Sequence, residues 1–127
     1  KLRQLVNENK WSEYFENGTR PTSLLGEDKK DIQDKLRSAK NIPKDWVAGK
    51  TKKNDGISFS RPGTDKADEV RIMPGDVGSS FVNSRKPYAE LKKDGKYCDK
   101  YGKNLPFKDN KPNHHNDSYI PLDEFPY

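Results

Sequence analysis

Two adjacent histidines, His114 and His115, are the side chains of this 127-residue chain best suited to proton transfer near neutral pH. Imidazole is the only side chain whose ordinary pKa lies between about 5 and 8. If the tail is extended, His115 and Tyr119 share one face, whereas His114 points the other way. We predict His115, with His114 as second choice, as acid or base, and Tyr119 as a donor to a phosphate or a stacking partner for a base. A solvated loop and a half-buried strand tyrosine are the respective alternatives.

The stretch 70–88, VRIMPGDVGSSFVNSRKPY, predicts a strand that stops at Pro74-Gly75, followed by a loop of small residues. Such a loop lets the backbone approach a ligand closely. Side chains that suit phosphate oxygens or an aromatic contact with a base follow at its end: Asn83, Ser84, Arg85, Lys86 and Tyr88. We predict a loop that faces phosphate, with Arg85 as its main residue. The alternative is a long hairpin connection on which Arg85 and Lys86 are surface residues without a binding role.

Further cations lie at predicted strands. Arg71 alternates with Val70 and Ile72, so it lies opposite their face and, if those two are core, on the open side of the sheet. Its alternative role is a cross-strand ion pair with Glu90 or Asp99. A small basic cluster follows Trp46: Lys50, Lys52 and Lys53. It suits contacts that position the phosphate backbone of a polyanion, and the alternative is a run of solvated charges.

Other kinds of site have little support. His114, His115 and Asp117 are the only grouped metal-ligand candidates, and no second Cys/His cluster exists, so we expect no metal and no cofactor. The phosphate-binding and nucleophile motifs built on spaced glycines are absent. Cys98, the single cysteine, lies in a predicted strand where it more often packs, and one cysteine allows no internal disulfide.

The elements that must position these side chains change character near residue 46. Apolar residues at helical spacing predict helices over 2–16 in pieces and over 24–40. Alternation then predicts strands over 56–60, 69–73, 88–91 and 96–99, with a turn at Asp94-Gly95, and an extended piece over 119–122. We therefore predict a single domain, residues 1–127, of α+β class: a helical lead-in over 1–45, then a four- to five-stranded antiparallel sheet over 46–127 that carries the site.

Composition and net charge limit the size of the core and the kinds of partner that the chain can bind. Hydrophobic residues make up 29% of the chain and charged residues 35%, which predicts a small core. The net charge is +5, and residues 50–111 carry fifteen basic and nine acidic side chains, which suits a polyanionic partner or serves solubility alone. No apolar stretch of the sequence is long enough to span a membrane, and we expect no signal peptide within these residues. The only methionine is Met73, so we expect a processed piece or an excised domain of a longer protein.

The second half of the chain resembles a C-terminal toxin domain of bacterial polymorphic toxins, as found in contact-dependent inhibition, Rhs and LXG proteins. The resemblance is carried, in order, by WVAGKTKK at 46–53, GISF at 56–59, VRIMPGD at 70–76, NSRKPY at 83–88, DGKYCDKYGK at 94–103 and YIPLDEF at 119–125. It implies the barnase/EndoU/colicin/RelE-like fold and a ribonuclease. It also implies a secreted or cell-surface effector that carries this domain at its C-terminus, with action in the target-cell cytoplasm.

The expected reaction is metal-independent cleavage of tRNA or ribosomal RNA. The 2′-hydroxyl attacks the phosphate, a base and an acid move the protons, and cations stabilise the phosphorane. The family pattern has a histidine where this chain has Tyr119, which leaves the usual assignment of the base open. The expected partner is a cognate, acidic immunity protein over the face with Arg71 and Arg85. The sequence leaves open whether a host translation factor is required as well. The alternatives are a metal-dependent DNase toxin and a non-catalytic module that binds RNA or an acidic partner.

Overall fold

The computed structural model describes residues 1–105 and 116–126 as helices followed by an antiparallel sheet. The helices are α1 (Leu2–Asn7), α2 (Trp11–Asn17) and α3 (Lys30–Ala39), and the 3-10 turns are η1 (Pro21–Leu25), η2 (Glu27–Lys29), η3 (Val82–Ser84) and η4 (Leu122–Glu124). The strands are β1 (Val47–Lys50), β2 (Ile57–Ser60), β3 (Glu69–Met73), β4 (Tyr88–Lys93), β5 (Lys96–Tyr97) and β6 (Ile120–Pro121). The α+β class with helices first is therefore confirmed.

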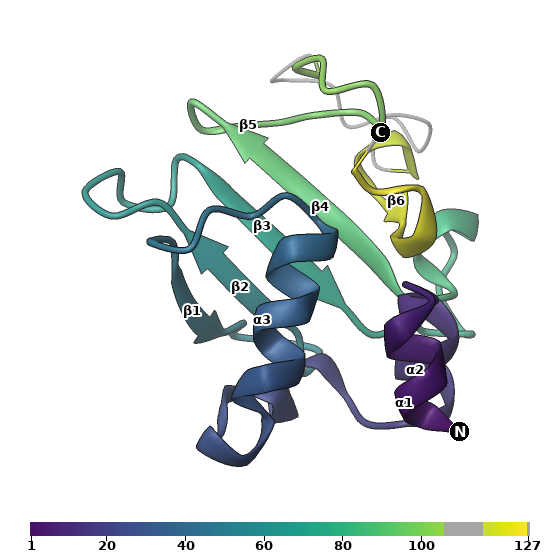
Figure 1. Cartoon of the computed structure of the whole chain (residues 1–127). Coiled ribbons are helices and arrows are strands. Elements are labelled where there is room, and N and C mark those ends of the chain that lie inside the picture. Colours follow the sequence, from purple (N-terminus) through teal and green to yellow (C-terminus); the bar gives the residue numbers. More distant parts are fainter. Residues whose placement is uncertain (106–115, 127) are drawn as a thin grey trace.

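The sheet has a simple order that brings the tail back to the middle strands. Strands β1 to β5 lie in sequence order, each antiparallel to the next, and β6 pairs with β4 (Figure 1). Because β3 occupies one edge of β4, the short strands β5 and β6 share its other edge. The β6 register places Pro121 beside Tyr88 and Ile120 beside Ala89. Tyr119 therefore enters the sheet next to the start of β4.

Two local predictions were wrong. The helix expected over 24–40 begins only at Lys30, because Gly26 has extended dihedral angles (φ −86°, ψ 159°) and separates two 3-10 turns. Glycine is among the residues that cost a helix most, so the break falls there. The sequence did not predict β1, which pairs with β2 across a turn where Asn54 and Asp55 adopt φ of 68° and 56°. Asn and Asp tolerate this left-handed conformation, and β1 brings the sheet to six strands.

The helices cover one face of the sheet (Figure 1). Alternate side chains of the central strands turn to that side and are buried: Ile57, Phe59, Val70, Ile72, Ala89 and Leu91. Leu36 of α3 is fully buried in the same core, and the guanidinium of Arg37 lies 4.7 Å from the centre of the Phe59 ring. The core thus takes one half of each strand's side chains, and the other half faces away from the helices.

The C-terminal turn is fastened to the helical layer by a buried lysine. Lys40 follows α3, and its Nζ donates hydrogen bonds to the carbonyl oxygens of Leu122, at 2.7 Å, and of Phe125. Burial lowers the pKa of Lys40 to about 8, although Asp123 opposes the change. Within residues 1–105 and 116–126, no helix is long and apolar enough to span a lipid bilayer.

Candidate functional site

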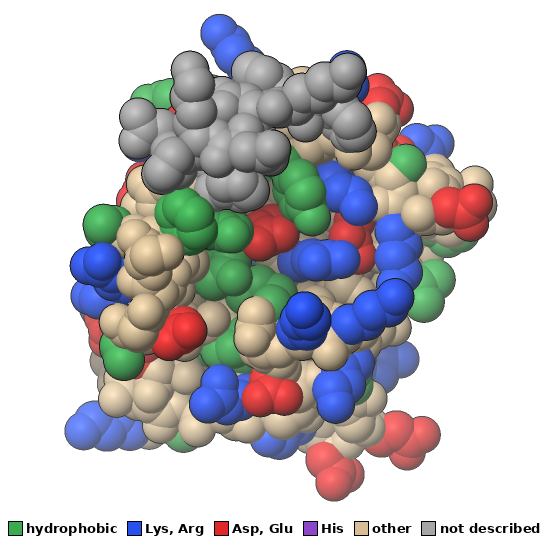
Figure 2. Space-filling view, turned by 180° about the vertical axis from the view of Figure 1, so that it is seen from behind, with side chains coloured by type: hydrophobic (Ala, Val, Ile, Leu, Met, Phe, Trp, Pro, Cys, Tyr) green, Lys and Arg blue, Asp and Glu red, His purple; other side chains and the backbone are tan. Residues whose placement is uncertain are grey.

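The face of the sheet opposite the helices carries polar side chains that the strand register assembles. Cross-strand partners lie directly opposite one another in β2, β3 and β4, and β5 adds one more residue. Their side chains alternate with the core residues, so they point away from the helices. Figure 2 shows this face, with acidic side chains near its centre and Lys and Arg side chains close beside them. We call this set the open-face cluster: Ser58, Glu69, Arg71, Glu90, Lys92 and Tyr97.

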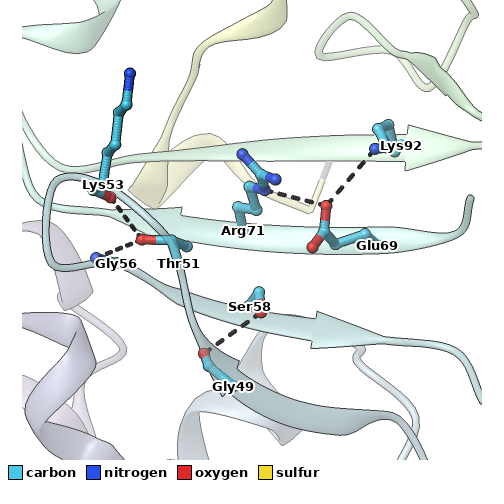
Figure 3. Close-up of polar contacts among 8 residues, drawn as sticks. All are labelled: Gly49, Thr51, Lys53, Gly56, Ser58, Glu69, Arg71 and Lys92. Atoms are coloured by element: carbon cyan, nitrogen blue, oxygen red, sulfur yellow. Dashed lines mark hydrogen bonds and ion pairs between the residues drawn. The ribbon is translucent and has the colours of Figure 1, made fainter. Parts of the chain in front are cut away.

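Glu69 is the anchor of the open-face cluster. Its side chain is 2% exposed, and its Oε1 accepts a hydrogen bond from Arg71 Nε at 3.0 Å (Figure 3). Lys92 Nζ lies 3.9 Å from the same oxygen. Glu69 and Arg71 are two residues apart in β3, so they share a face, and Lys92 is the register partner of Glu69. The other carboxylate oxygen, Oε2, is buried and has no hydrogen-bond partner among the described residues.

Arg71 lies opposite Val70 and Ile72, as the alternation predicted, and its side chain is 34% exposed. It forms an ion pair, as the alternative interpretation held, but the partner is Glu69 of the same strand and not Glu90 or Asp99. Among the described residues, the only hydrogen bond from the Arg71 side chain is the one from Nε. No hydrogen bond to a described residue uses the two terminal amino groups, and their planar arrangement suits two phosphate oxygens.

Glu90 is the member of the open-face cluster suited to proton transfer. It lies directly opposite Arg71 in the register, where Cβ atoms are typically about 5 Å apart. Burial raises the pKa of the Glu90 carboxyl to about 7; Arg71 opposes this rise, Glu69 adds to it and Lys92 opposes it. A carboxyl group in this range exchanges its proton near neutral pH, which is the property required of a general base or acid.

Sequence reasoning treated Glu90 only as an ion-pair partner and did not consider Glu69. The signal was present in YAEL at 88–91 and EVRIM at 69–73. Once the apolar alternate residues of both stretches are assigned to the core, the remaining residues must share the opposite face. A carboxyl group in the middle of such a face is unusual, because strands disfavour Glu there.

Aromatic side chains lie at two sides of the open face, and one of them, Tyr97, belongs to the open-face cluster itself. The rings of Tyr88 and Tyr119 are 4.9 Å apart and tilted by 57°, and Phe81 lies 5.7 Å from Tyr119. Tyr97 lies on the other side, with Lys92 Nζ 5.6 Å from its ring centre. Burial raises the pKa of all three tyrosines, so their hydroxyl groups stay protonated at neutral pH and can donate. Tyr88 and Tyr119 were both predicted as site residues, and the structure brings them together.

A cavity of about 430 Å³, which we call the tyrosine cavity, opens where Tyr88 and Tyr119 meet the loops. Its polar rim comes from the β1–β2 turn and the segment after β3. The lining includes Arg20, Asp55, Pro74, Gly75, Asp76 and Ser84. The size and the mixed aromatic and polar lining suit a planar heterocycle such as a nucleobase.

Arg85 and Lys86 are not part of the open-face cluster. They line a separate groove of about 460 Å³, which we call the second groove, together with residues that follow α2. Arg85 Nε donates to the carbonyl oxygen of Ser79 at 2.9 Å, which fixes its side chain along the loop. The long connection between β3 and β4 is thus an ordered loop with its own hydrogen bonds, but the structure separates its cations from Arg71.

The basic cluster after Trp46 is divided by the turn. Lys50 pairs with Ile57 at the end of β1, so its position in the register is on the helix-covered side. Lys52 and Lys53 are exposed in the turn, where Thr51 Oγ1 donates to the Lys53 carbonyl oxygen at 2.6 Å (Figure 3). Thr51 Oγ1 also accepts a hydrogen bond from Gly56 N, so the turn is closed. Lys52 and Lys53 lie at the β1–β2 turn, whose next residues line the tyrosine cavity.

The two predicted histidines, His114 and His115, lie outside the described residues. In the part of the chain that the structure describes, no three His, Cys, Asp or Glu side chains are grouped as a metal site. No protein-family model, no curated protein and no solved structure matches the chain.

Proposed function

We propose that this chain is an endoribonuclease whose active site is the open-face cluster with its bordering tyrosines. One observation supports this most: a carboxyl group with a pKa near 7, Glu90, lies directly opposite an arginine whose terminal amino groups face the open side. A base beside a phosphate-binding cation is the minimum equipment for attack by the 2′-hydroxyl of RNA.

The proposed reaction uses each group once. Glu90 accepts the proton of the 2′-hydroxyl, and the oxygen attacks the adjacent phosphorus. The terminal amino groups of Arg71 donate to the phosphorane oxygens, on which negative charge increases. The 5′-oxygen leaves with a proton, and a 2′,3′-cyclic phosphate remains. His115, with His114 as second choice, is the candidate donor of that proton by the sequence argument.

Glu69 is a positioning residue in this proposal. It holds Arg71 through Nε and leaves the planar end of the guanidinium directed at the substrate. Tyr119 donates to a phosphate or stacks on a base next to the cleaved bond. DNA lacks the 2′-hydroxyl, so these residues acting alone predict RNA as substrate.

The biological setting comes from the sequence resemblance and is part of the same proposal. The domain acts as an antibacterial toxin on tRNA or ribosomal RNA in the cytoplasm of a target cell, delivered by a longer effector. An acidic immunity protein neutralises it by covering Arg71 and the neighbouring lysines of the open face. A host translation factor is a further candidate partner, and adding cell extract to the cleavage assay tests whether one is needed.

The test is cleavage of total bacterial RNA in EDTA by wild type, Glu90→Gln and Arg71→Ala, with mapping of the ends. We expect discrete cuts with 2′,3′-cyclic phosphate ends, lost in both variants. Glu13→Gln, a change of the same kind on the exposed side of α2, is the matched control and should cleave like wild type. Cleavage only after addition of Mg²⁺, with DNA also cut, would favour the DNase alternative. Intact RNA even with cell extract added would favour the non-catalytic binding module.

A further inference from the structure

The loop between β3 and β4 joins two hollows on the surface. The tyrosine cavity and the groove lined by Arg85 and Lys86 share three wall residues: Arg20, Pro74 and Gly75. They are therefore neighbours, separated by the Pro74–Gly75 segment with Arg20 beside it. A chain-like ligand that occupies one hollow can continue into the other without leaving the surface.

We propose that the substrate is a single-stranded RNA segment that runs from the open-face cluster, past the tyrosine cavity and over Pro74–Gly75, into the second groove. Arg20, Arg85 and Lys86 bind its phosphates there as a subsite remote from the cleaved bond. This inference rests on the proposed ribonuclease function and adds the form of the substrate and the direction of its path. It also moves Arg85 from the chemical step to substrate binding.

The loop is built to hold these cations in place. A Cβ on Gly75 would overlap the backbone of Lys86 and the carbonyl oxygen of Arg85, so only glycine allows this close packing. Asp76 N donates to the carbonyl oxygen of Ser84 at 2.9 Å, which closes the loop at its base. Arg85 Nε is used within the loop, as Arg71 Nε is used in the sheet, and Arg85 as a whole is exposed.

Charge supports a polyanion as the occupant. Arg85 and Lys86 are exposed, and within the described part of the chain neither forms an ion pair. Arg20 is paired only loosely, with its Nε 3.7 Å from Asp55 and both side chains more than half exposed. Such a surface pair is worth little, so a phosphate can take over the guanidinium. Three cations and one carboxylate, Glu16, line the second groove.

The tyrosine cavity favours single strands. A base reaches the ring of Tyr119 only if it is turned out of a stack, which a paired duplex resists. Base stacking on an aromatic ring tolerates any sequence, whereas phosphate contacts carry the dependence on salt. The path therefore predicts affinity for single strands of several nucleotides.

The test compares two substrates and two double variants. The substrates are a dinucleotide containing the bond that is cut in total RNA, and a single-stranded 12-mer with that bond at its centre. Arg85→Ala/Lys86→Ala removes the proposed subsite. Arg61→Ala/Lys66→Ala is the matched control, because it removes the same residue types at the opposite end of β2 and β3, where both side chains are also exposed.

For Arg85→Ala/Lys86→Ala we expect KM for the 12-mer to rise roughly tenfold with kcat retained, and dinucleotide kinetics to stay unchanged. The slope of log KM against log salt for the 12-mer should fall by about 1.4, or about 0.7 for each lost phosphate contact. A 12-mer paired with its complement should compete at least tenfold less well than the single strand. Equal losses on both substrates would return Arg85 to the chemical step, and no loss on either would overturn the subsite.

Failure of the ribonuclease proposal is distinguishable from failure of the subsite. If wild type cuts no RNA, fluorescence polarisation with a labelled 12-mer reads the subsite directly. Binding weakened roughly tenfold by the Arg85/Lys86 variant and unchanged by its control would support the RNA path in a non-catalytic protein. Equal binding by all three proteins would overturn the path and leave an acidic protein as the occupant of the groove.

Discussion

The unusual pKa of Glu90 makes a prediction about stability that needs no substrate. The carboxyl pKa is raised from an ordinary 4.5 to about 7 in the folded protein. Below about pH 4.5 both the folded and the unfolded chain hold this proton. Between pH 4.5 and pH 7 the unfolded chain releases it and the folded chain keeps it, so the free energy of unfolding falls as the pH rises. Glu90 therefore contributes its full stabilisation below about pH 4.5, and this stabilisation is lost as the pH rises to the pKa of the folded state, about 7.

The size of the effect follows from the same two values. Between pH 5 and pH 8, proton linkage of this one carboxyl group removes about 2.5 kcal/mol of stability. Glu90→Gln cannot titrate, so its stability relative to wild type should rise by that amount over the interval. Urea unfolding followed by Trp fluorescence at both pH values measures this change. We call it the double difference: the stability of the variant minus that of wild type at pH 8, less the same quantity at pH 5. Other titrating groups cancel, because they are common to both proteins.

The control is Glu13→Gln, whose side chain is exposed on α2 and whose double difference should be near zero. A Glu90→Gln double difference below about 0.5 kcal/mol would mean that the carboxyl titrates like an exposed one. The assignment of Glu90 as general base would then lose its physical basis, whatever the variant does to RNA cleavage.

Three further predictions concern the site and the scaffold. Arg71→Ala should lower kcat/KM by about 10²–10³ and move the acid limb of the pH profile upward, because Arg71 lowers the pKa of Glu90; Arg71→Lys should keep the limb and lose only part of the rate. Burial lowers the pKa of Lys40 to about 8, so the unfolded chain binds more protons than the folded chain above that pH. From about pH 7.5 to pH 10, the free energy of unfolding of wild type, measured in urea, should therefore rise by about 2 kcal/mol relative to that of Lys40→Met. Gly75→Ala should destabilise by about 2 kcal/mol or more because its Cβ overlaps backbone, whereas Gly26→Ala, whose Cβ meets nothing within 4 Å, should be neutral or slightly stabilising in thermal unfolding.

Period-two alternation was enough to predict the central strands and the side of the sheet on which Arg71 lies. Local turn chemistry predicted the Asp94-Gly95 hairpin, where both residues have positive φ. These features depend on neighbours in sequence, so sequence alone determines them well. The predicted role of Arg85 depended instead on where a nineteen-residue stretch places its end, which local patterns do not contain.

The pairing of distant segments could not be predicted. Tyr119 meets Tyr88 only because β6 returns to the free edge of β4, and Glu90 meets Arg71 only through the β3–β4 register. β1 was missed because its basic and glycine residues do not look like a strand until β2 supplies a partner. Tertiary context decided each of these cases against local propensity.

The open-face cluster is difficult to explain by stability alone. Glu69 is buried, and among the described residues one of its carboxylate oxygens has no hydrogen-bond partner. Burial raises the pKa of nearby Glu90 to about 7, so its carboxyl group is about half protonated at neutral pH. Buried ionic groups of this kind are commonly no more stabilising than apolar residues of similar size. The core on the other face of the same strands is fully apolar, so the chain has no general difficulty in supplying such residues. Two carboxyl groups and an arginine share the face of the sheet opposite the helices, beside a cavity lined by tyrosines, which is the arrangement that the proposed active site requires.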